Sequence, residues 1–329
     1  MKEGVLLFNL GGPETLEDVR PFLYNLFSDP DILRIRSDVL RRSLAWILAA
    51  TRQRKSRGLY RQIGGGSPLR RITEAQAAAL AAELASRGRE VRVYVGMRCW
   101  KPTIDEAVQR LLRDGIRRLV LLPLFPQYSM TTTGSCFRYF RTLDGRLGLS
   151  PKIQISYIQS WYKESLYVEA MADLIRAALM RFSEEGRARV RLLYSAHSLP
   201  ARYIEEGDPY LEQSRESAAL IDACLGTAHA STLAFQSKDG PVKWLGPDTR
   251  DVLADLAGKG VERVLAVPIS FISDHIETLQ EMDIQYKQLA AKLGIREFHR
   301  ADAPNLHPTF IRALADLTIR EWNSPVGRG

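Results

Sequence analysis

Short, unbroken apolar runs recur along the chain and indicate buried strands. They include VLLFNL at residues 5–10, LVLLP at 119–123, LLY at 192–194 and VLAVP at 264–268. A half-exposed strand alternates apolar and polar residues, whereas a strand of a parallel sheet is covered on both faces and is apolar throughout. Helix-like stretches lie between these runs. The pattern therefore predicts an α/β fold with doubly wound parallel sheets.

The two halves of the chain repeat one spacing of prolines and glycines. In each half a strand-like run is followed by a proline, a helical stretch, a glycine and a second strand that ends in a proline. These residues are Pro102, Gly115 and Pro123 in the first half and Pro247, Gly260 and Pro268 in the second. The first proline precedes the glycine by 13 residues and the second proline by 21 residues in both halves. Because proline favours helix starts and glycine favours helix ends, the repeat predicts two Rossmann-like domains of related topology.

A chain of 329 residues is long for a single core, so two domains are expected. A glycine-bearing segment at residues 145–152 approaches the boundary. We expect a first domain over residues 1–155 and a second over 156–303. A C-terminal segment, residues 304–329, carries a last helix that we expect to pack back on the first domain.

Ligands of doubly wound folds bind beyond the carboxyl ends of the strands. The segments at those ends are 9–14, 125–135, 195–200 and 270–277, and we expect them to line one cleft between the two domains. Motifs for other chemistries are missing from the sequence. No G-x-G-x-x-G follows a strand, and there is no G-x-x-x-x-G-K-[ST]. Nicotinamide, flavin and nucleoside triphosphate chemistry therefore lose most of their support.

The composition is that of an ordinary globular protein, with 45% hydrophobic and 26% charged residues. No apolar run approaches the roughly 20 residues that span a bilayer, and the chain begins directly with a strand rather than a signal peptide. The three cysteines form no C-x-x-C pair, which argues against a disulfide framework and against a zinc or iron–sulfur site formed by neighbouring residues. A cytoplasmic protein is expected.

The net charge of +8 is concentrated between residues 34 and 61, where Asp38 is the one acidic residue. The cations are Arg34, Arg36, Arg41, Arg42, Arg52, Arg54, Lys55, Arg57 and Arg61. Apolar residues are interleaved with them, among them Leu40, Trp46 and Ile47. Such a stretch suits nucleic acid, an anionic membrane surface or an anionic ligand, and it is equally typical of a solvated surface helix.

Three titratable residues follow strand ends in the second half. His197 comes directly after the strand at 192–194, and Glu277 and Glu281 follow the strand that ends at Pro268. If residues from 274 on open a helix, Glu277 and Glu281 share one of its faces. A lone histidine is more often structural, and carboxylates near a helix start favour its dipole. Together, however, these groups suit acid–base or metal-handling chemistry.

Six motifs, in order along nearly the whole chain, resemble those of ferrochelatases. They are NLGGPE at 9–14, YRQIGGGSP at 60–68, PQYS and TTGS within 126–135, SAHSLP at 195–200, WLGP at 244–247 and SDHIETLQEMDI at 273–284. The resemblance implies two Rossmann-like domains around a porphyrin cleft. It also implies insertion of ferrous iron into protoporphyrin IX, which gives protohaem and releases two protons.

The same motifs imply residue roles. His197 and Glu277 match the family's inner pair, which handles the metal and accepts pyrrole protons; whether His197 acts as base or as metal ligand stays open. Glu281 resembles the next member of an acidic path for metal or protons. The third position of that path, often acidic in relatives, is Gln285 here. In the family this helix carries a π-bulge, so ideal α-helical spacing is not assumed.

Porphyrin contacts are carried over by motif position. The implied contacts with the propionates or the pocket wall are Arg52, Tyr60, Ser67 and Arg98, and the apolar walls are Leu10, Trp244 and Phe271. For each aromatic residue, ordinary core packing is an equal alternative. Many relatives have an aromatic residue where this chain has Cys99.

The resemblance also sets expectations for cofactors and partners. We expect no tightly bound cofactor and no 2Fe–2S cluster, with Fe²⁺ as a substrate. We also expect a monomer, no nucleic-acid partner, and peripheral contact of the basic stretch with an anionic membrane surface. Three other functions stay open: a coproporphyrin III ferrochelatase, a cobalt or nickel chelatase, and a non-catalytic two-lobed solute-binding protein.

Overall fold

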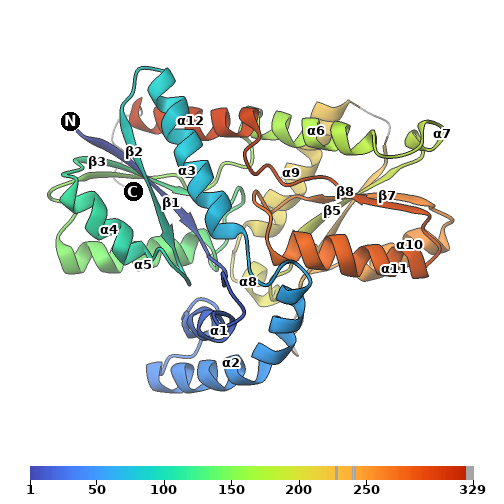
Figure 1. Ribbon diagram of the computed structural model, residues 1–329, viewed down its shortest axis with the longest axis horizontal. Helices are drawn as coiled ribbons and strands as arrows, with labels where there is room; N and C mark the ends of the chain where they lie inside the picture. The colour runs from blue at the N-terminus through green and yellow to red at the C-terminus, as the bar shows by residue number, and fades with distance from the viewer. Residues whose placement is uncertain (227–228, 239, 241, 324–329) are drawn as a thin grey trace. The chain divides into compact units, whose positions relative to one another are not determined.

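The computed structural model describes residues 1–226, 229–238, 240 and 242–323 (Figure 1). The chain forms two compact units: Met1–Trp161 with the chain from Ile311 on, and Tyr162–Phe310. Both boundaries lie a few residues later than residues 155 and 303. Trp161 stays with the first unit because its indole N–H donates to the carbonyl of Pro123 at 2.8 Å. The last six residues of the expected C-terminal segment, 324–329, lie outside the described residues.

The first unit contains a four-stranded parallel sheet in the order β2-β1-β3-β4. Its strands are β1 (Glu3–Asn9), β2 (Val91–Met97), β3 (Arg118–Pro123) and β4 (Gln154–Tyr157). The central strand β1 is fully buried from Val5 to Phe8, which explains why it is apolar on both faces.

Helices cover both faces of this sheet. They are α3 (Leu69–Ser86) and α12 (Pro308–Asn323) on one face, and α4 (Ile104–Arg113) and α5 (Thr133–Leu147) on the other (Figure 1). Helix α4 starts at a capping box, in which Thr103 and Glu106 bond each other's backbone N–H groups. From Ile311 on, α12 is tied to this unit by an ion pair between Asp316 and Arg87.

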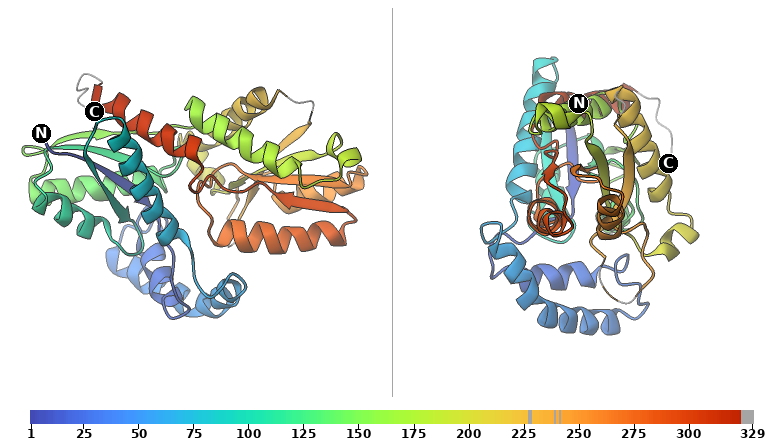
Figure 2. Two further views of the ribbon diagram at one scale, coloured as in Figure 1. Left: turned by 45° about the horizontal axis from the view of Figure 1, so that its top comes forward. Right: turned by 90° about the vertical axis from the view of Figure 1, so that its right-hand side faces the viewer.

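Two further helices of the first unit lie beyond the carboxyl ends of its strands (Figure 2). Helices α1 (Val19–Ser28) and α2 (Asp38–Arg61) pack on each other, with Ala45 and Ala49 of α2 buried. On its outer side α2 leaves large apolar side chains in solvent, including Leu40 (63% exposed) and Trp46 (57% exposed). Among the described residues, none of the helices has the length and apolar character needed to cross a membrane.

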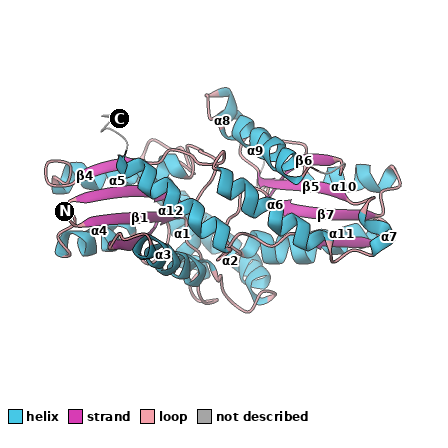
Figure 3. Ribbon diagram, turned by 90° about the horizontal axis from the view of Figure 1, so that it is seen from above, coloured by secondary structure: helices cyan, strands magenta, loops and turns pink. Residues whose placement is uncertain are grey.

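The second unit repeats the architecture of the first. Its parallel sheet has the order β6-β5-β7-β8 (Figure 3). In both units the first strand along the chain lies between the second and the third, and the fourth pairs with the third. The strands are β5 (Arg191–His197), β6 (Ser231–Gln236), β7 (Arg263–Pro268) and β8 (Glu297–Arg300). The predicted duplication of a doubly wound α/β fold is therefore confirmed.

Helices again lie on both faces of the second sheet (Figure 1). Helices α6 (Ser165–Leu179) and α9 (Tyr210–Leu225) pack together on one face. The other face carries α10 (Thr249–Gly258), the π-helix η1 (Glu277–Tyr286) and α11 (Lys287–Lys292). Their core includes Leu253 of α10, Met282 and Tyr286 of η1, and Val264 of β7. Two short helices, α7 (Glu184–Arg187) and α8 (Ala201–Glu205), lie in loops.

Gly66, in the motif at 60–68, allows a close backbone approach that a larger residue prevents. A Cβ atom at Gly66 would overlap the main-chain carbonyl of Glu14, whereas a Cβ atom at Gly58, inside α2, would meet open space. We expect Gly66→Ala to lower the free energy of unfolding by roughly 1–3 kcal/mol. Gly58→Ala, the matched control, should raise it by about 0.5 kcal/mol because alanine favours the helix. Urea unfolding of both variants tests this, and equal stabilities would contradict it.

Candidate active site

The strand order of the second unit brings three chain segments to one edge of its sheet. β5 lies between β6 and β7, and the chain runs from β5 toward β6 on one side but from β7 toward β8 on the other, so the topological switch point lies between the carboxyl ends of β5 and β7. His197 is the last residue of β5 and Gln236 the last of β6. The segment after β7 leads from Ser270 to Glu277, the first residue of η1.

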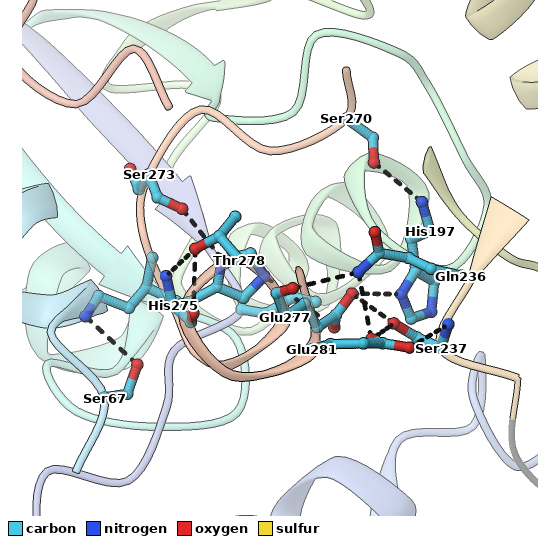
Figure 4. A network of polar contacts seen from close by, with 12 residues as sticks. Ser67, His197, Gln236, Ser237, Ser270, Ser273, His275, Glu277, Thr278 and Glu281 are labelled. Atoms are coloured by element: carbon cyan, nitrogen blue, oxygen red, sulfur yellow. Dashed lines mark hydrogen bonds and ion pairs between the residues drawn. The ribbon is translucent and has the colours of Figure 1, made fainter. Parts of the chain in front are cut away.

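His197 and Glu277, the predicted inner pair, are in direct contact at this edge (Figure 4). The ring Nδ1 of His197 lies 2.8 Å from Oε2 of Glu277. The backbone N–H of His197 donates to the hydroxyl of Ser270 at 3.0 Å, which fixes the end of β5 to the loop after β7. The side chain of His197 is 39% exposed and that of Glu277 23% exposed, so a ligand can reach both.

Each member of this pair shifts the pKa of the other. Burial alone would raise the pKa of Glu277, but the charge of His197 and its hydrogen bond lower that pKa to about 2. Burial alone would lower the pKa of His197, but the carboxylate of Glu277 raises that pKa above its ordinary value of 6.5. The pair therefore holds an ionised carboxylate beside an imidazole that can take up and release a proton near neutral pH.

Glu281 lies one π-helical turn further, 8% exposed, with both carboxylate oxygens bonded. Its Oε1 accepts from the backbone N–H of Ser237 at 3.0 Å and from the hydroxyl of Tyr286 at 2.8 Å. Its Oε2 accepts from the hydroxyl of Ser237 at 2.5 Å and from the amide of Gln236 at 3.1 Å. Four donors thus compensate for the burial of this carboxylate.

The helix that carries both glutamates is π-helical along all ten residues of η1, more than a bulge. Arg300, whose side chain is 6% exposed, bonds Asp283 of η1 through Nε and Nη2 at 2.9 Å each. The same guanidinium lies 3.1 Å from Asp274, just before the helix. Asp283 is thereby engaged in an ion pair with Arg300.

The arrangement offers a nitrogen and an oxygen donor to a divalent cation. Among the residues that the structure describes, no three His, Cys, Asp or Glu side chains are grouped to hold a metal ion. The oxygens of Glu281 are occupied by donors of the protein, as described above. The partly exposed donors of His197 and Glu277 are thus the ones that a metal ion could contact here.

The predicted porphyrin contacts in the first unit lie near the ends of its strands and on α2. Leu10 follows β1, and Ser67 precedes α3 with its backbone N–H bonded to the carbonyl of Pro13 at 2.7 Å. Arg52 lies 5.2 Å above the ring of Phe27. Tyr60, near the end of α2, is 5% exposed. Their contacts with a porphyrin stay predictions.

Arg98, predicted to meet a propionate, has strong partners inside the first unit. Its guanidinium lies 3.1 Å from the fully buried carboxylate of Asp29 and donates to the hydroxyl of Ser135 at 2.9 Å. Ser135 in turn donates to Asp29 at 2.6 Å, and the guanidinium stacks over the ring of Tyr139 at 4.5 Å. The charge of Arg98 is therefore balanced within the protein, which leaves less of it for a substrate carboxylate.

The two predicted apolar walls of the second unit differ in their surroundings. The ring of Phe271 lies 6.5 Å from the ring of His197 and 4.8 Å from that of His275, both edge-on. Phe271 thus borders the inner pair directly. Trp244 is half-buried in the segment after β6, where it forms an isolated bridge with Pro200.

Sequence reasoning missed three residues of this site: Gln236, Ser237 and His275. Ser237 contacts both glutamates, and Nε2 of His275 lies 4.0 Å from Oε1 of Glu277 (Figure 4). The signal for Gln236 and Ser237 was their place directly after an apolar strand, the same signal that selected His197. Position alone does not mark Gln236 and Ser237 as candidates, because neither side chain is titratable near neutral pH.

Comparison with known proteins gives sequence matches over nearly the whole chain. The family model described as Ferrochelatase matches residues 2–322. A curated protein named Ferrochelatase from Nostoc sp. is 50% identical over 98% of this chain and 83% of its own length. Proteins of the same name from Nostoc punctiforme and Synechococcus elongatus are 51% and 49% identical over the same shares of both chains.

Solved structures show the same fold at low sequence identity. SirB from Bacillus subtilis with Fe3+ superposes with a TM-score of 0.59 at 12% identity, covering 98% of this chain and 96% of that one. The sirohydrochlorin chelatase SirB from Bacillus subtilis subspecies spizizenii, in complex with cobalt, gives 0.55 at 13% identity and covers 98% and 97%. These two matches support the fold alone.

The contact between His197 and Glu277 predicts a shift in titration when the charge is removed. In Glu277→Gln the carboxylate that raises the pKa of His197 is gone, so burial should lower that pKa. We expect the imidazole to lose its proton at a lower pH than in the wild type, as followed by NMR of the ring nitrogens. Glu212→Gln, which removes a carboxylate that is 77% exposed on α9, is the control and should leave the titration unchanged. Identical curves for Glu277→Gln and wild type would contradict the assignment.

Proposed function

The chain belongs to the ferrochelatase family. From that premise we propose that it inserts Fe²⁺ into protoporphyrin IX beside the carboxyl ends of β5 and β7. The observation that carries the site assignment is the 2.8 Å contact between His197 and Glu277. His197 supplies a base and Glu277 an anion, side by side. The reaction uses both, because two protons leave the porphyrin ring and a dication enters it.

The chemistry explains why such a pair is suited to the task. Two pyrrole N–H protons must leave, and the flat macrocycle must bend so that nitrogen lone pairs face the metal. Binding the ring in a bent form uses binding energy from the rest of the porphyrin. His197 in its neutral form takes a pyrrole proton, and the adjacent carboxylate stabilises the imidazolium that results.

The edge-on ring of Phe271 supports a macrocycle beside this pair. A phenyl ring whose centroid lies 6.5 Å from that of the imidazole provides an apolar surface beside His197, where we place a pyrrole of the porphyrin. Leu10 and Trp244 are proposed as further apolar contacts, and Arg52, Tyr60 and Ser67 as polar contacts with the propionates. Arg98 is assigned here to the pocket wall because Asp29 balances its charge.

Two protons must also be removed from the site once they leave the porphyrin. Glu281 is proposed as the next proton acceptor after Glu277, because the hydroxyl of Ser237 contacts both carboxylates. Its four hydrogen bonds keep it fixed, which favours proton handling over metal coordination. Gln285 replaces the acidic residue of many relatives, so no further carboxylate of η1 is assigned to this path.

A tightly bound cofactor is not part of the proposal. A 2Fe–2S cluster bound by thiolates needs four cysteines, and this sequence has three. Burial raises the pKa of Cys99 to about 12 and also raises that of Cys136, so both thiols stay protonated and are poor ligands. All three cysteines are free, in keeping with a reducing compartment, and a cytoplasmic location is proposed.

The partners proposed for the chain are the porphyrin, the haem product and an anionic membrane surface. On α2, arginines are interleaved with exposed apolar side chains, which fits a lipid surface better than a nucleic-acid backbone. No nucleic-acid partner is proposed. A monomer is proposed because one chain supplies every residue assigned to the chemistry.

The reaction itself is tested by anaerobic insertion of Fe²⁺ into protoporphyrin IX, followed by absorbance. We expect rapid insertion by the wild type. His197→Ala should bind porphyrin but insert iron at least 100-fold more slowly, because its proton acceptor is missing. Coproporphyrin III is the comparison substrate. Activity on coproporphyrin alone would overturn the choice of porphyrin, and a His197→Ala variant as fast as wild type would overturn the site assignment.

The membrane contact is tested by sedimentation with vesicles. At low salt we expect the protein to co-sediment with vesicles that contain anionic lipid, and to be released by high salt because the charges are then screened. Leu40→Ser/Ile47→Ser should weaken binding, since both side chains are at least half exposed on α2. Met180→Ser, which removes a side chain that is 64% exposed near the end of α6, is the control. Failure of the wild type to co-sediment would exclude this contact.

A further inference from the structure

Ser237 occupies an unusual backbone conformation directly beside the two glutamates. It follows β6 with φ +65°, in the left-handed region that non-glycine residues rarely adopt. Such conformations persist where surrounding contacts hold them, and they concentrate at functional sites. In Ser237 this conformation turns both the backbone N–H and the hydroxyl toward η1 (Figure 4).

The hydroxyl of Ser237 lies between the two carboxylates. Its Oγ is 2.5 Å from Oε2 of Glu281 and 3.0 Å from Oε2 of Glu277. A hydroxyl carries one hydrogen and two lone pairs, so it can donate to just one of these oxygens. The shorter distance assigns that hydrogen to Glu281. The contact with Glu277 therefore becomes a full hydrogen bond only when Glu277 itself carries a proton and donates it to Oγ.

Four atoms of the site consequently form one continuous path. From Nδ1 of His197 the steps are 2.8 Å to Oε2 of Glu277, 3.0 Å to Oγ of Ser237 and 2.5 Å to Oε2 of Glu281. Each step is within hydrogen-bond distance. The amide of Gln236 holds the far end in place by donating to the same oxygen of Glu281 at 3.1 Å.

We propose that the hydroxyl of Ser237 relays protons from Glu277 to Glu281 during metal insertion. This inference rests on the proposed function and deepens it. His197 takes a pyrrole proton at Nε2 and releases the proton on Nδ1 to Oε2 of Glu277. That proton passes to Oγ of Ser237 as the O–H bond of Ser237 breaks and its proton binds Oε2 of Glu281. Ser237 ends with one proton as before, and one proton has moved from the pair to Glu281.

The relay gives a function to a backbone conformation that serine does not favour. Glycine at position 237 would adopt φ +65° without strain and would keep the N–H bond to Glu281. A merely structural role for the residue would therefore favour glycine. The hydroxyl is the one feature that serine adds and glycine lacks, and it is the atom that joins the two carboxylates.

The experiment uses Ser237→Ala, Ser237→Gly and Ser231→Ala in the full chain. Ser237→Ala removes the hydroxyl and keeps the strained backbone, whereas Ser237→Gly removes both the hydroxyl and the strain. Ser231 is the matched control because it lies at the other end of β6 and also donates to a carboxylate, that of Asp222. We measure single-turnover insertion of Fe²⁺ into protoporphyrin IX, porphyrin affinity by fluorescence quenching, and thermal stability.

Both Ser237 variants should insert iron about tenfold more slowly, with porphyrin affinity unchanged within about twofold. Ser237→Gly should melt at or above the wild-type temperature, so that its slow reaction cannot come from unfolding. Raising the concentration of MES buffer should accelerate both variants but not the wild type, because the buffer then accepts the stranded proton. Ser231→Ala should match the wild type in rate.

Two results would overturn the relay while the proposed function stands. One is insertion at the wild-type rate by either Ser237 variant, in a protein whose His197→Ala variant is inactive. The other is slow insertion that buffer does not accelerate, which would assign Ser237 to positioning alone. Inactivity of the wild type itself would instead overturn the proposed function.

Discussion

The parallel order β6-β5-β7 is the constraint on which the site depends. Because all strands of the second unit run in the same direction, every chain segment that leaves a strand end emerges at one edge of the sheet. His197 ends β5, Ser237 follows β6 and Glu277 lies in the segment after β7, so the three are neighbours although up to 80 positions separate them in sequence. Tyr286 and Met282 of η1 belong to the same buried apolar cluster as Val264 of β7, which packs this helix on the sheet.

Electrostatic balance at this edge explains how ionisable groups are kept beside an apolar wall. Glu277 stays ionised because the attraction of His197 outweighs the cost of burial. Glu281, more deeply buried, relies on four hydrogen-bond donors instead. One carboxylate is thus paired with a group that exchanges protons, and the other is fixed in place. This difference gives the two glutamates of one helix different parts in the same reaction.

The helix that carries them is stabilised from outside the site. A ten-residue π-helical run is rare, since π-helical turns are mostly isolated. The guanidinium of Arg300 holds Asp274 before this helix and Asp283 within it, and it is itself buried. In the first unit, Asp29 and Arg98 form a comparable buried pair that joins the end of α1 to the end of β2. Removing one partner of such a pair leaves an unpaired buried charge and lowers the stability of the fold. The pairs therefore hold together the segments that they connect.

The sequence by itself determined the α/β class, the duplicated topology and the strand ends at which chemistry is placed. Short unbroken apolar runs bounded by turn residues favour strands covered on both faces, and the proline and glycine spacing repeats because both halves start and end their helices in the same way. Their place after strand ends singled out His197, Glu277 and Glu281, and motif resemblance then implied their roles. The tertiary structure decided what spacing cannot encode. It placed Ser237 between two carboxylates, made η1 π-helical, and engaged Arg98 with Asp29, because these outcomes depend on contacts between segments far apart in the chain.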